Sequence, residues 1–189
     1  MMMGVGPRRE VEGPTLGRHQ QVGESRELPQ GQAMLTYEVQ PHRGVGPVML
    51  GMERMRVHEV MPESPCSFKK TPVSEYETDA FHQSGFQVFY GGDSPRVEYI
   101  ELSRDCGFSV FYRKIDVFGT PASELVDLLS RDAAIDQSNP EHGYSYSFPE
   151  LDLCVWRSVI PDSASDEEGR RFDTIGIGVE GYFTGHPGS

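Results

Sequence analysis

The sequence predicts an α+β fold in which about six antiparallel strands form one sheet and two helices pack on one face of it. Two segments, residues 52–61 and 123–129, carry apolar residues at helical spacing. Each is followed by short segments rich in β-branched and aromatic residues, which is typical of strands. Apolar positions in the first half recur in the second half at a nearly constant difference in residue number. We therefore predict a tandem duplication of a helix-plus-meander unit.

The first 33 residues differ in composition from the rest of the chain. They hold six glycines and three prolines and none of the 19 aromatic residues. Such a segment buries too little apolar surface to offset the entropy lost on ordering, so we expect residues 1–33 to be a disordered tail. Alternatively, translation starts at Met34, where 34–39 reads as the entry to a first strand. The ordered domain is predicted to span residues 34–186.

The duplication is predicted from spacing rather than from identical residues. An offset of 68 places Gly51 on Gly119, and an offset of 67 or 75 aligns the strands that follow. Repeat 1 then covers about residues 36–112 and repeat 2 about residues 113–183. The aligned apolar pairs are Val57 with Leu125, Val60 with Leu128, Met61 with Leu129, Phe81 with Phe148, Phe86 with Leu153, Val88 with Val155, Phe89 with Trp156, Ile100 with Ile175 and Leu102 with Ile177.

Local signals place the individual elements. Thr120 is a good N-cap for the second helix, and Pro121 suits its first position because that N–H would be unpaired in any case. Residues 90–95, which contain two glycines and a proline, predict a turn between two strands. Residues 108–118 predict one long strand, and 144–148 alternate polar and apolar residues as a half-buried strand does.

Charge and cysteine content limit the classes of function. The formal net charge is -12, which repels nucleic-acid phosphates and anionic lipids and favours a protein partner with a basic surface. The three cysteines are widely spaced, so a reducing, cytoplasmic compartment is the simplest expectation. No run approaches the roughly 18 apolar residues of a membrane helix. We also expect neither a secretory signal peptide nor a bound cofactor.

Residues 176–181 match the pattern G-x-G-x-x-G, which in nucleotide-binding proteins joins a strand to a helix. Only eight residues follow, and they include Pro187 and two further glycines. We therefore interpret the motif as a glycine-containing last strand.

The densest acidic cluster is the segment 162–169, which carries Asp162, Asp166, Glu167 and Glu168. Its carboxylates lack the alternation of a calcium-binding loop. A solvated surface loop is the simpler interpretation. The alternative is a contact loop for a basic partner, because the segment falls in the insertion that distinguishes repeat 2 from repeat 1.

Three aromatic residues, Trp156, Tyr144 and Tyr146, are candidates for a binding face. Aromatic side chains dominate the energetics of protein interfaces, but on strands they more often belong to the core. Both interpretations remain open at this stage.

Catalytic and metal-binding patterns are weak. The histidines at 42, 58, 82 and 142 are not spaced as metal-binding histidines are, so no metal site is expected. No nucleophile elbow is present, and Cys154 lies in a strand segment where a buried, inert thiol is expected. Cys66, in a proline-flanked loop, is the better candidate for an exposed thiol.

The glycine-rich opening at 44–52, followed by Val57 and Val60, resembles a group of small uncharacterised bacterial cytosolic proteins over roughly residues 36–183. Some proteins of this sort are immunity partners of bacterial toxins, so the resemblance implies such a role. The tandem layout is also similar to that of β-lactamase-inhibitory proteins and of outer-membrane assembly lipoproteins with a Gly-Met helix start. Because the chain lacks their signal peptide, lipidation cysteine and paired cysteines, we do not expect an envelope or secreted role.

Two functional hypotheses follow. The first is a non-catalytic intracellular protein that binds a basic partner, in the manner of an immunity protein that neutralises a toxin. The second is a small hydrolase-type enzyme whose site is assembled between the two repeats from Asp79, His82, His142 and Glu150, which flank equivalent hairpins.

Overall fold

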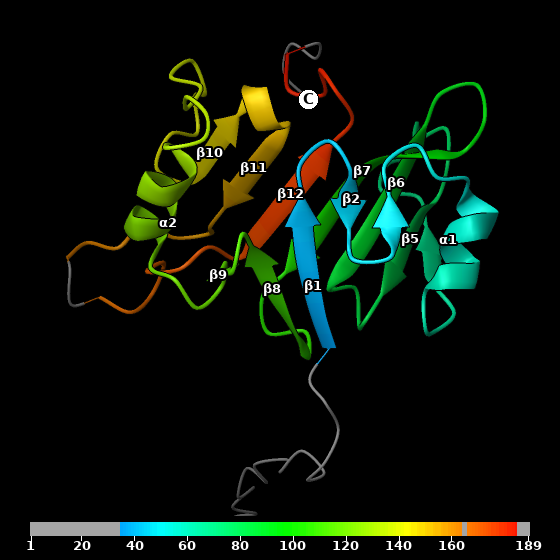
Figure 1. The fold of residues 1–189 in the computed structure, drawn as a ribbon, viewed down its shortest axis with the longest axis horizontal. Coiled ribbons are helices and arrows are strands. Elements are labelled where there is room, and N and C mark those ends of the chain that lie inside the picture. The colour runs from blue at the N-terminus through cyan, green and yellow to red at the C-terminus, as the bar shows by residue number, and fades with distance from the viewer. Residues whose placement is uncertain (1–34, 164–165, 185–189) are drawn as a thin grey trace, which may run out of the picture. The chain divides into compact units, whose positions relative to one another are not determined.

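The fold is described from a computed structural model, which covers residues 35–163 and 166–184 (Figure 1). The expected disordered tail, 1–33, and the alternative start at Met34 lie outside these residues. The described elements are β1 Leu35–Gln40, β2 Gly44–Val45, β3 Val48–Met49, α1 Arg54–Val60, β4 Cys66–Phe68, β5 Thr78–Phe81, β6 Phe86–Gly91, β7 Arg96–Ser103, β8 Phe108–Tyr112, β9 Ile115–Asp116, α2 Ala122–Leu129, β10 Ser145–Phe148, the 3-10 helix η1 Pro149–Leu151, β11 Leu153–Trp156 and β12 Thr174–Gly178.

The larger sheet has seven strands in the order β10-β11-β12-β7-β6-β5-β4, and all neighbours are antiparallel. Its central strand is β7, which pairs with β12 so that Ile100 lies opposite Ile177. The turn predicted at 90–95 joins β6 to β7, as expected. A register shift between Phe89 and Tyr90 leaves Glu98 of β7 without a partner on β6.

The smaller sheet has five strands in the order β3-β2-β1-β8-β9. Its central pair, β1 and β8, runs parallel, with Leu35 opposite Phe108, and the remaining pairs are antiparallel. The protein is therefore α+β with mostly antiparallel sheets, but the strands form two sheets rather than one sheet of about six. The long strand predicted over 108–118 is also interrupted, because Arg113 and Lys114 adopt positive φ angles in a tight turn between β8 and β9.

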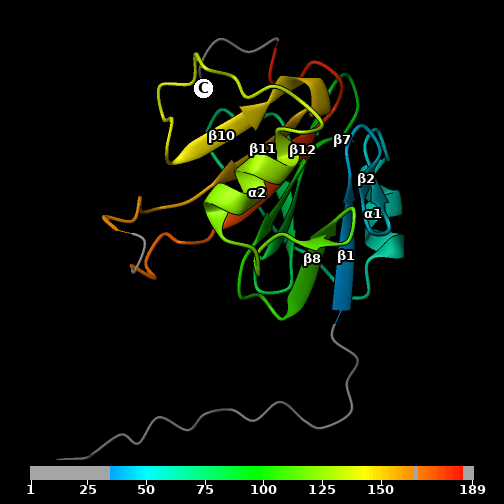
Figure 2. The same cartoon turned by 60° about the vertical axis from the view of Figure 1, so that its left-hand side comes forward.

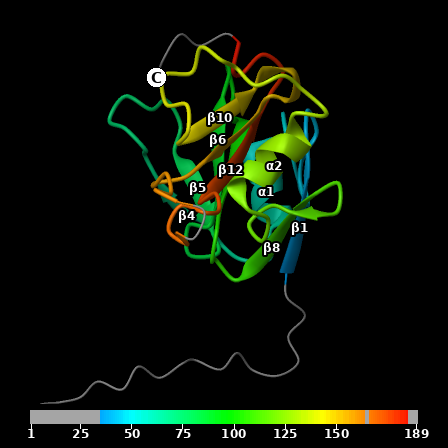
Figure 3. The same ribbon diagram turned by 90° about the vertical axis from the view of Figure 1, so that its left-hand side faces the viewer.

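Both helices and the smaller sheet lie on the same side of the larger sheet (Figure 3). The core fills the space between these layers. Inward-facing residues of the larger sheet, such as Val88 and Ile100, are fully buried there together with Val57 of α1 and Leu125 and Leu129 of α2. Figure 2 shows α2 against the β10–β12 side of the larger sheet and α1 beyond β1 and β2. The opposite, outer face of the larger sheet carries no helix among the described residues.

The two helices lie where the apolar spacing predicts them, although their ends differ from the expectation. The second helix begins at Ala122 with Pro121 as its N-cap, so the predicted capping role of Thr120 is wrong. The Thr120 hydroxyl instead donates to the backbone oxygen of Asp116, which closes the turn before the helix. In the described part of the chain no helix is long and apolar enough to cross a membrane.

The duplication stays a prediction. After α1 the chain adds β5, β6 and β7 to the larger sheet, and after α2 it adds β10, β11 and β12. The described part of the second half, however, has no counterpart of β4 at the sheet edge.

The glycine motif at 176–181 is confirmed as part of a last strand followed by turns. A Cβ atom at Gly176 would lie 1.8 Å from the hydroxyl oxygen of Tyr99, and one at Gly178 would lie 2.4 Å from the side chain of Tyr182. The Tyr99 and Tyr182 rings stack, with centroids 4.8 Å apart. The glycines therefore let two tyrosine rings lie flat on the outer face of β12.

Candidate functional site

The exposed indole of Trp156 marks one end of the outer face. Trp156 ends β11 and lies opposite Thr174 on β12 and Ser145 on β10. Alternation along β11 buries Leu153 and Val155 on the core face, whereas Trp156 points outward and is 38 % exposed. A large aromatic side chain left half in water on an open sheet face is a candidate contact residue.

The three aromatic residues predicted as a binding face do not share one surface. Tyr146 lies opposite Val155 and therefore faces the core, where its ring packs on Phe172 with centroids 5.9 Å apart. Tyr144 is 44 % exposed and precedes β10. Because side chains alternate between the faces of a strand, Trp156 and Tyr146 lie on opposite sides of the sheet. Tyr146 is therefore partly buried against the core, on the face of the sheet opposite to Trp156.

The loop from residue 157 to 173 leaves the sheet directly after Trp156, and its base is held by a buried arginine. Arg157 donates from Nε to the backbone oxygen of Gly143 and from Nη1 to that of Gly169, both at 2.8 Å. Its guanidinium also lies 5.8 Å from the ring centroid of Phe172. Gly169 has a φ of +69°, and a Cβ there would lie 2.0 Å from the backbone oxygen of Val159. Only glycine therefore fits where these two segments of the loop approach each other.

A second set of hydrogen bonds holds the C-terminal end of the loop, at Asp173. The Asp173 carboxylate accepts hydrogen bonds from the backbone N–H and the hydroxyl of Ser158, both at 2.8 Å, and from Nη2 of Arg104 at 2.8 Å. The backbone oxygen of Arg170 also accepts from the N–H of Ala122, at the first position of α2. The loop therefore has a fixed base that joins β11, β12 and α2.

The four acidic residues predicted as contacts lie at the tip of this loop, and they differ in the hydrogen bonds and ion pairs that they form. Asp166 accepts hydrogen bonds from the backbone N–H groups of Asp162 and Glu168. Glu167 pairs with Arg170 and, at 3.9 Å, with Arg171. Asp162 and Glu168 are exposed, so they are the carboxylates best placed to meet a partner.

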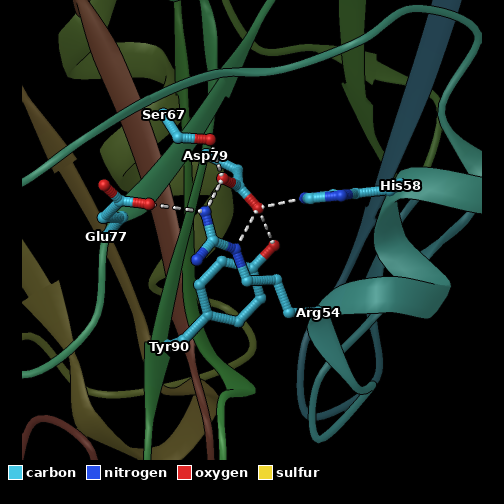
Figure 4. A network of polar contacts seen from close by, with 6 residues as sticks. All are labelled: Arg54, His58, Ser67, Glu77, Asp79 and Tyr90. Atoms are coloured by element: carbon cyan, nitrogen blue, oxygen red, sulfur yellow. Dashed lines mark hydrogen bonds and ion pairs between the residues drawn. The ribbon is translucent and has the colours of Figure 1, made fainter.

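A separate polar cluster surrounds Asp79 on β5, whose side chain is fully buried (Figure 4). Arg54 binds both carboxylate oxygens, from Nε to Oδ2 at 2.9 Å and from Nη2 to Oδ1 at 2.7 Å. Nε2 of His58 lies 2.6 Å from Oδ2, and the Tyr90 hydroxyl donates to the same atom at 2.8 Å. The Ser67 hydroxyl donates to Oδ1 at 2.6 Å. Five hydrogen bonds thus converge on one carboxylate.

The surroundings of Asp79 fix its charge. Burial alone would raise the pKa of the carboxyl, but the hydrogen bonds from Arg54, Ser67, His58 and Tyr90 outweigh it and lower the pKa to about 2. The same contact raises the pKa of the Arg54 guanidinium above its usual value. Burial and the hydrogen bond to Asp79 raise the pKa of Tyr90, so its hydroxyl stays protonated and acts as a donor.

This arrangement favours a structural role for the cluster. Arg54 and His58 come from one face of α1, four residues apart, while Ser67, Asp79 and Tyr90 come from three adjacent strands. A carboxylate with all its acceptor positions filled is a poor general base. The cluster instead fastens α1 to the edge of the larger sheet.

The structure does not bring together the four residues suggested for an enzyme site. His82 lies in the turn directly after β5, and its Nε2 lies 2.6 Å from the Tyr37 hydroxyl. His142 and Glu150 flank β10, at the other side of the larger sheet. Four strands separate β5 from β10, which corresponds to roughly 24 Å at the usual strand spacing. The expected convergence of Asp79, His82, His142 and Glu150 is therefore wrong.

The thiols match the sequence expectation in two respects. Cys66 is exposed as expected, but it lies on strand β4 rather than in a loop, and all three cysteines are free. Burial raises the pKa of the Cys154 thiol to about 11, even though its Sγ lies 3.2 Å from the Tyr99 hydroxyl. Cys154 is thus an unreactive thiol at neutral pH. Among residues 35–163 and 166–184, no group of three or more acidic, histidine or cysteine side chains is arranged to hold a metal ion.

Sequence reasoning missed the partners of Asp79 and the anchoring role of Arg157. The spacing of Arg54 and His58 on the predicted helix was a usable signal, since it places two donors on one helix face. Their acceptor could not be identified, because it lies 21 to 25 residues further along the chain. For Arg157, whose acceptors are backbone carbonyls, the sequence carries no signal.

Comparison with known proteins adds no relative from which a role could be transferred: no family model, no curated protein and no solved structure matches this chain.

Proposed function

We propose that this chain is a non-catalytic binding protein that engages a protein with a basic surface through Trp156 and the acidic tip of the loop 157–173. The observation that carries the proposal is the anchored loop itself. Its base is fastened by Arg157 and Asp173, while Asp162 and Glu168 are exposed at its tip. A rigid base lowers the entropy lost on binding, so a preformed acidic tip favours association.

The charge distribution supports a basic partner. The chain has 29 acidic and 17 basic residues, and residues 1–33 contain four arginines and four glutamates that cancel. The whole charge of -12 therefore falls on residues 34–189. A field of this sign speeds the encounter with a positively charged protein and makes the association rate depend on salt.

The class of partner is also part of the proposal. The resemblance to small uncharacterised bacterial proteins, some of which are immunity partners of toxins, favours a toxin with a basic surface. Three free cysteines fit a reducing compartment, so we propose that the complex forms in the cytoplasm. A hydrolase-type activity remains the alternative, but it requires residues other than the separated set described above.

The test begins with capture of partners from native lysate and continues with association rates at two salt concentrations. We expect the rate to fall by about tenfold or more between low and high salt if the acidic surface steers binding. The variant Asp162→Asn/Glu168→Gln should slow association, whereas Trp156→Ala should mainly speed dissociation. The matched control is Glu124→Gln/Asp127→Asn, which removes two exposed carboxylates from α2.

Two outcomes contradict the proposal. Association that does not change with salt would exclude steering by the acidic surface. An equal effect of the loop variant and the α2 control would show that net charge acts without a defined contact loop.

A further inference from the structure

A pocket of about 340 Å³ opens beside the β6–β7 turn, at the end of the larger sheet opposite to Trp156. Its lining combines an aromatic ring, Phe89, with the carboxylates of Glu75 and Glu98 and the ammonium group of Lys70. Trp156 is paired with Thr174 of β12, which is paired in turn with Ser103 at the C-terminal end of β7. The pocket lies near the other end of β7. The pocket is therefore distinct from the contact surface proposed above.

The chain places a cation of its own in this pocket. Nζ of Lys70 lies 4.5 Å from the centroid of the Phe89 ring, which is a cation–π contact. Lys70 lies two residues after the end of β4 and is exposed, so it reaches the ring from the solvent side. The described residues include no carboxylate within ion-pair distance of Lys70, so its ammonium is held chiefly by the ring.

The backbone leaves room for a carboxylate in the wall of the pocket. A Cβ at Gly91 would lie 1.9 Å from Oε2 of Glu98, so the Glu98 side chain lies directly against this glycine. The opposite wall is fixed by the Tyr76 hydroxyl, which donates to the backbone oxygen of Gly92 at 3.0 Å. An aromatic face with carboxylates around it, in a concave site, is the chemistry that recognises ammonium and guanidinium groups.

We propose that this pocket binds the cationic side chain of a lysine from a basic protein partner, and that Lys70 occupies the same place when no partner is present. The Phe89 face supplies the cation–π contact. Glu75 and Glu98 line the same pocket and add negative charge around it without a direct ion pair. Lys70 is weakly held and exposed, so a partner lysine displaces it at little cost. This inference rests on the basic partner proposed above, which the pocket and the loop 157–173 would contact at two separate places.

The test uses N-acetyl-lysine amide as the probe and follows the Phe89 backbone amide by NMR titration. Lys70→Ala removes the internal competitor and should lower the dissociation constant of the probe by about three- to tenfold relative to the native protein. Lys69→Ala, which removes the neighbouring exposed lysine, is the matched control and should leave the constant unchanged. Adding Glu98→Gln to Lys70→Ala should reverse part of the gain, because it removes negative charge from the wall of the pocket.

Several results would overturn this proposal. Equal binding by the Lys70→Ala and Lys69→Ala proteins would show that Lys70 does not occupy the site. Equal binding of N-acetyl-norleucine amide, which has the alkyl chain without the charge, would show that the pocket does not select a cation. Retained binding after Glu98→Gln would remove the carboxylate from the recognition. Thermal unfolding of each variant verifies folding, and because the probe is a small molecule, the result is independent of the protein partner proposed above.

Discussion

The guanidinium of Arg54 and the carboxylate of Asp79 face each other in a contact of two parallel hydrogen bonds, 2.9 Å and 2.7 Å long. Asp79 is fully buried and Arg54 is partly exposed, so the pair joins the surface of α1 to the interior of the larger sheet. His58 adds a second donor from the same helix at 2.6 Å. The position of α1, which is only seven residues long, depends on this carboxylate as well as on the burial of Val57.

The variant Asp79→Asn should lower the free energy of unfolding by about 3–5 kcal/mol, because it leaves the Arg54 cation without its buried partner. Urea denaturation measures the change. Glu77→Gln is the matched control: Glu77 also pairs with Arg54, at 3.2 Å, but its side chain is 48 % exposed. This change should cost less than about 1 kcal/mol. Similar losses for the two variants would contradict a special role for the buried carboxylate.

Acid should unfold the protein partly through Asp79. The folded-state pKa of this carboxyl is lowered from 3.8 to about 2, so the group contributes stability that is fully present above pH 3.8 and is lost as the pH falls toward 2. The shift corresponds to roughly 2 kcal/mol. Urea denaturation at a series of pH values between 2 and 5 measures this slope.

The control for the acid effect is the Asp79→Asn protein, which has no titratable group at this position. Its stability should decline less steeply than that of the native protein over the same pH range. Parallel declines would place the acid sensitivity in other carboxyl groups.

The packing of Tyr99 on Gly176 gives a third prediction. Gly176→Ala places a methyl group 1.8 Å from the tyrosine hydroxyl oxygen, so the ring must move and about 1–3 kcal/mol of stability should be lost. Thermal or urea unfolding measures the loss. In a Tyr99→Ala background the same change should cost much less, since the clash is absent. Additive losses in the double variant would mean that the ring does not rest on this glycine.

The sequence predicts those features that depend on neighbouring residues. α1 lies within the predicted segment 52–61 and α2 begins one residue before the predicted segment 123–129, because the apolar residues recur at helical spacing. The turn at 90–95 and the last strand at 176–178 also follow from local glycine and alternation patterns.

The partition of the strands into two sheets could not be predicted, because it depends on pairing between distant residues. Leu35 and Phe108 are neighbours in a parallel pair although 73 positions separate them, and no local pattern distinguishes this from antiparallel pairing. Which side of the sheet Tyr146 faces could not be predicted for the same reason. The alternation of residues 144–148 shows that the strand has two faces, but not which face is buried. The Asp79 cluster likewise forms only when α1 and three strands come together.

The buried side chain of Arg157 gives the last prediction. It is 9 % exposed and holds two parts of the chain by their backbone oxygens, at Gly143 and Gly169. Arg157→Met keeps most of the apolar stem but removes both hydrogen bonds, so the loop 157–173 should lose its fixed base. We expect a loss of about 2 kcal/mol in stability and faster hydrogen exchange in the loop.

The matched control for Arg157→Met is Arg170→Met, which removes an arginine that is 41 % exposed and pairs with Glu167 near the tip. That variant should change global stability by less than about 1 kcal/mol. If a rigid base is what makes the acidic tip effective, Arg157→Met should also weaken binding of a basic partner although no contact residue is altered. Unchanged binding by a protein whose loop exchanges rapidly would show that the partner does not need a preformed loop, and Trp156 would then be the principal contact.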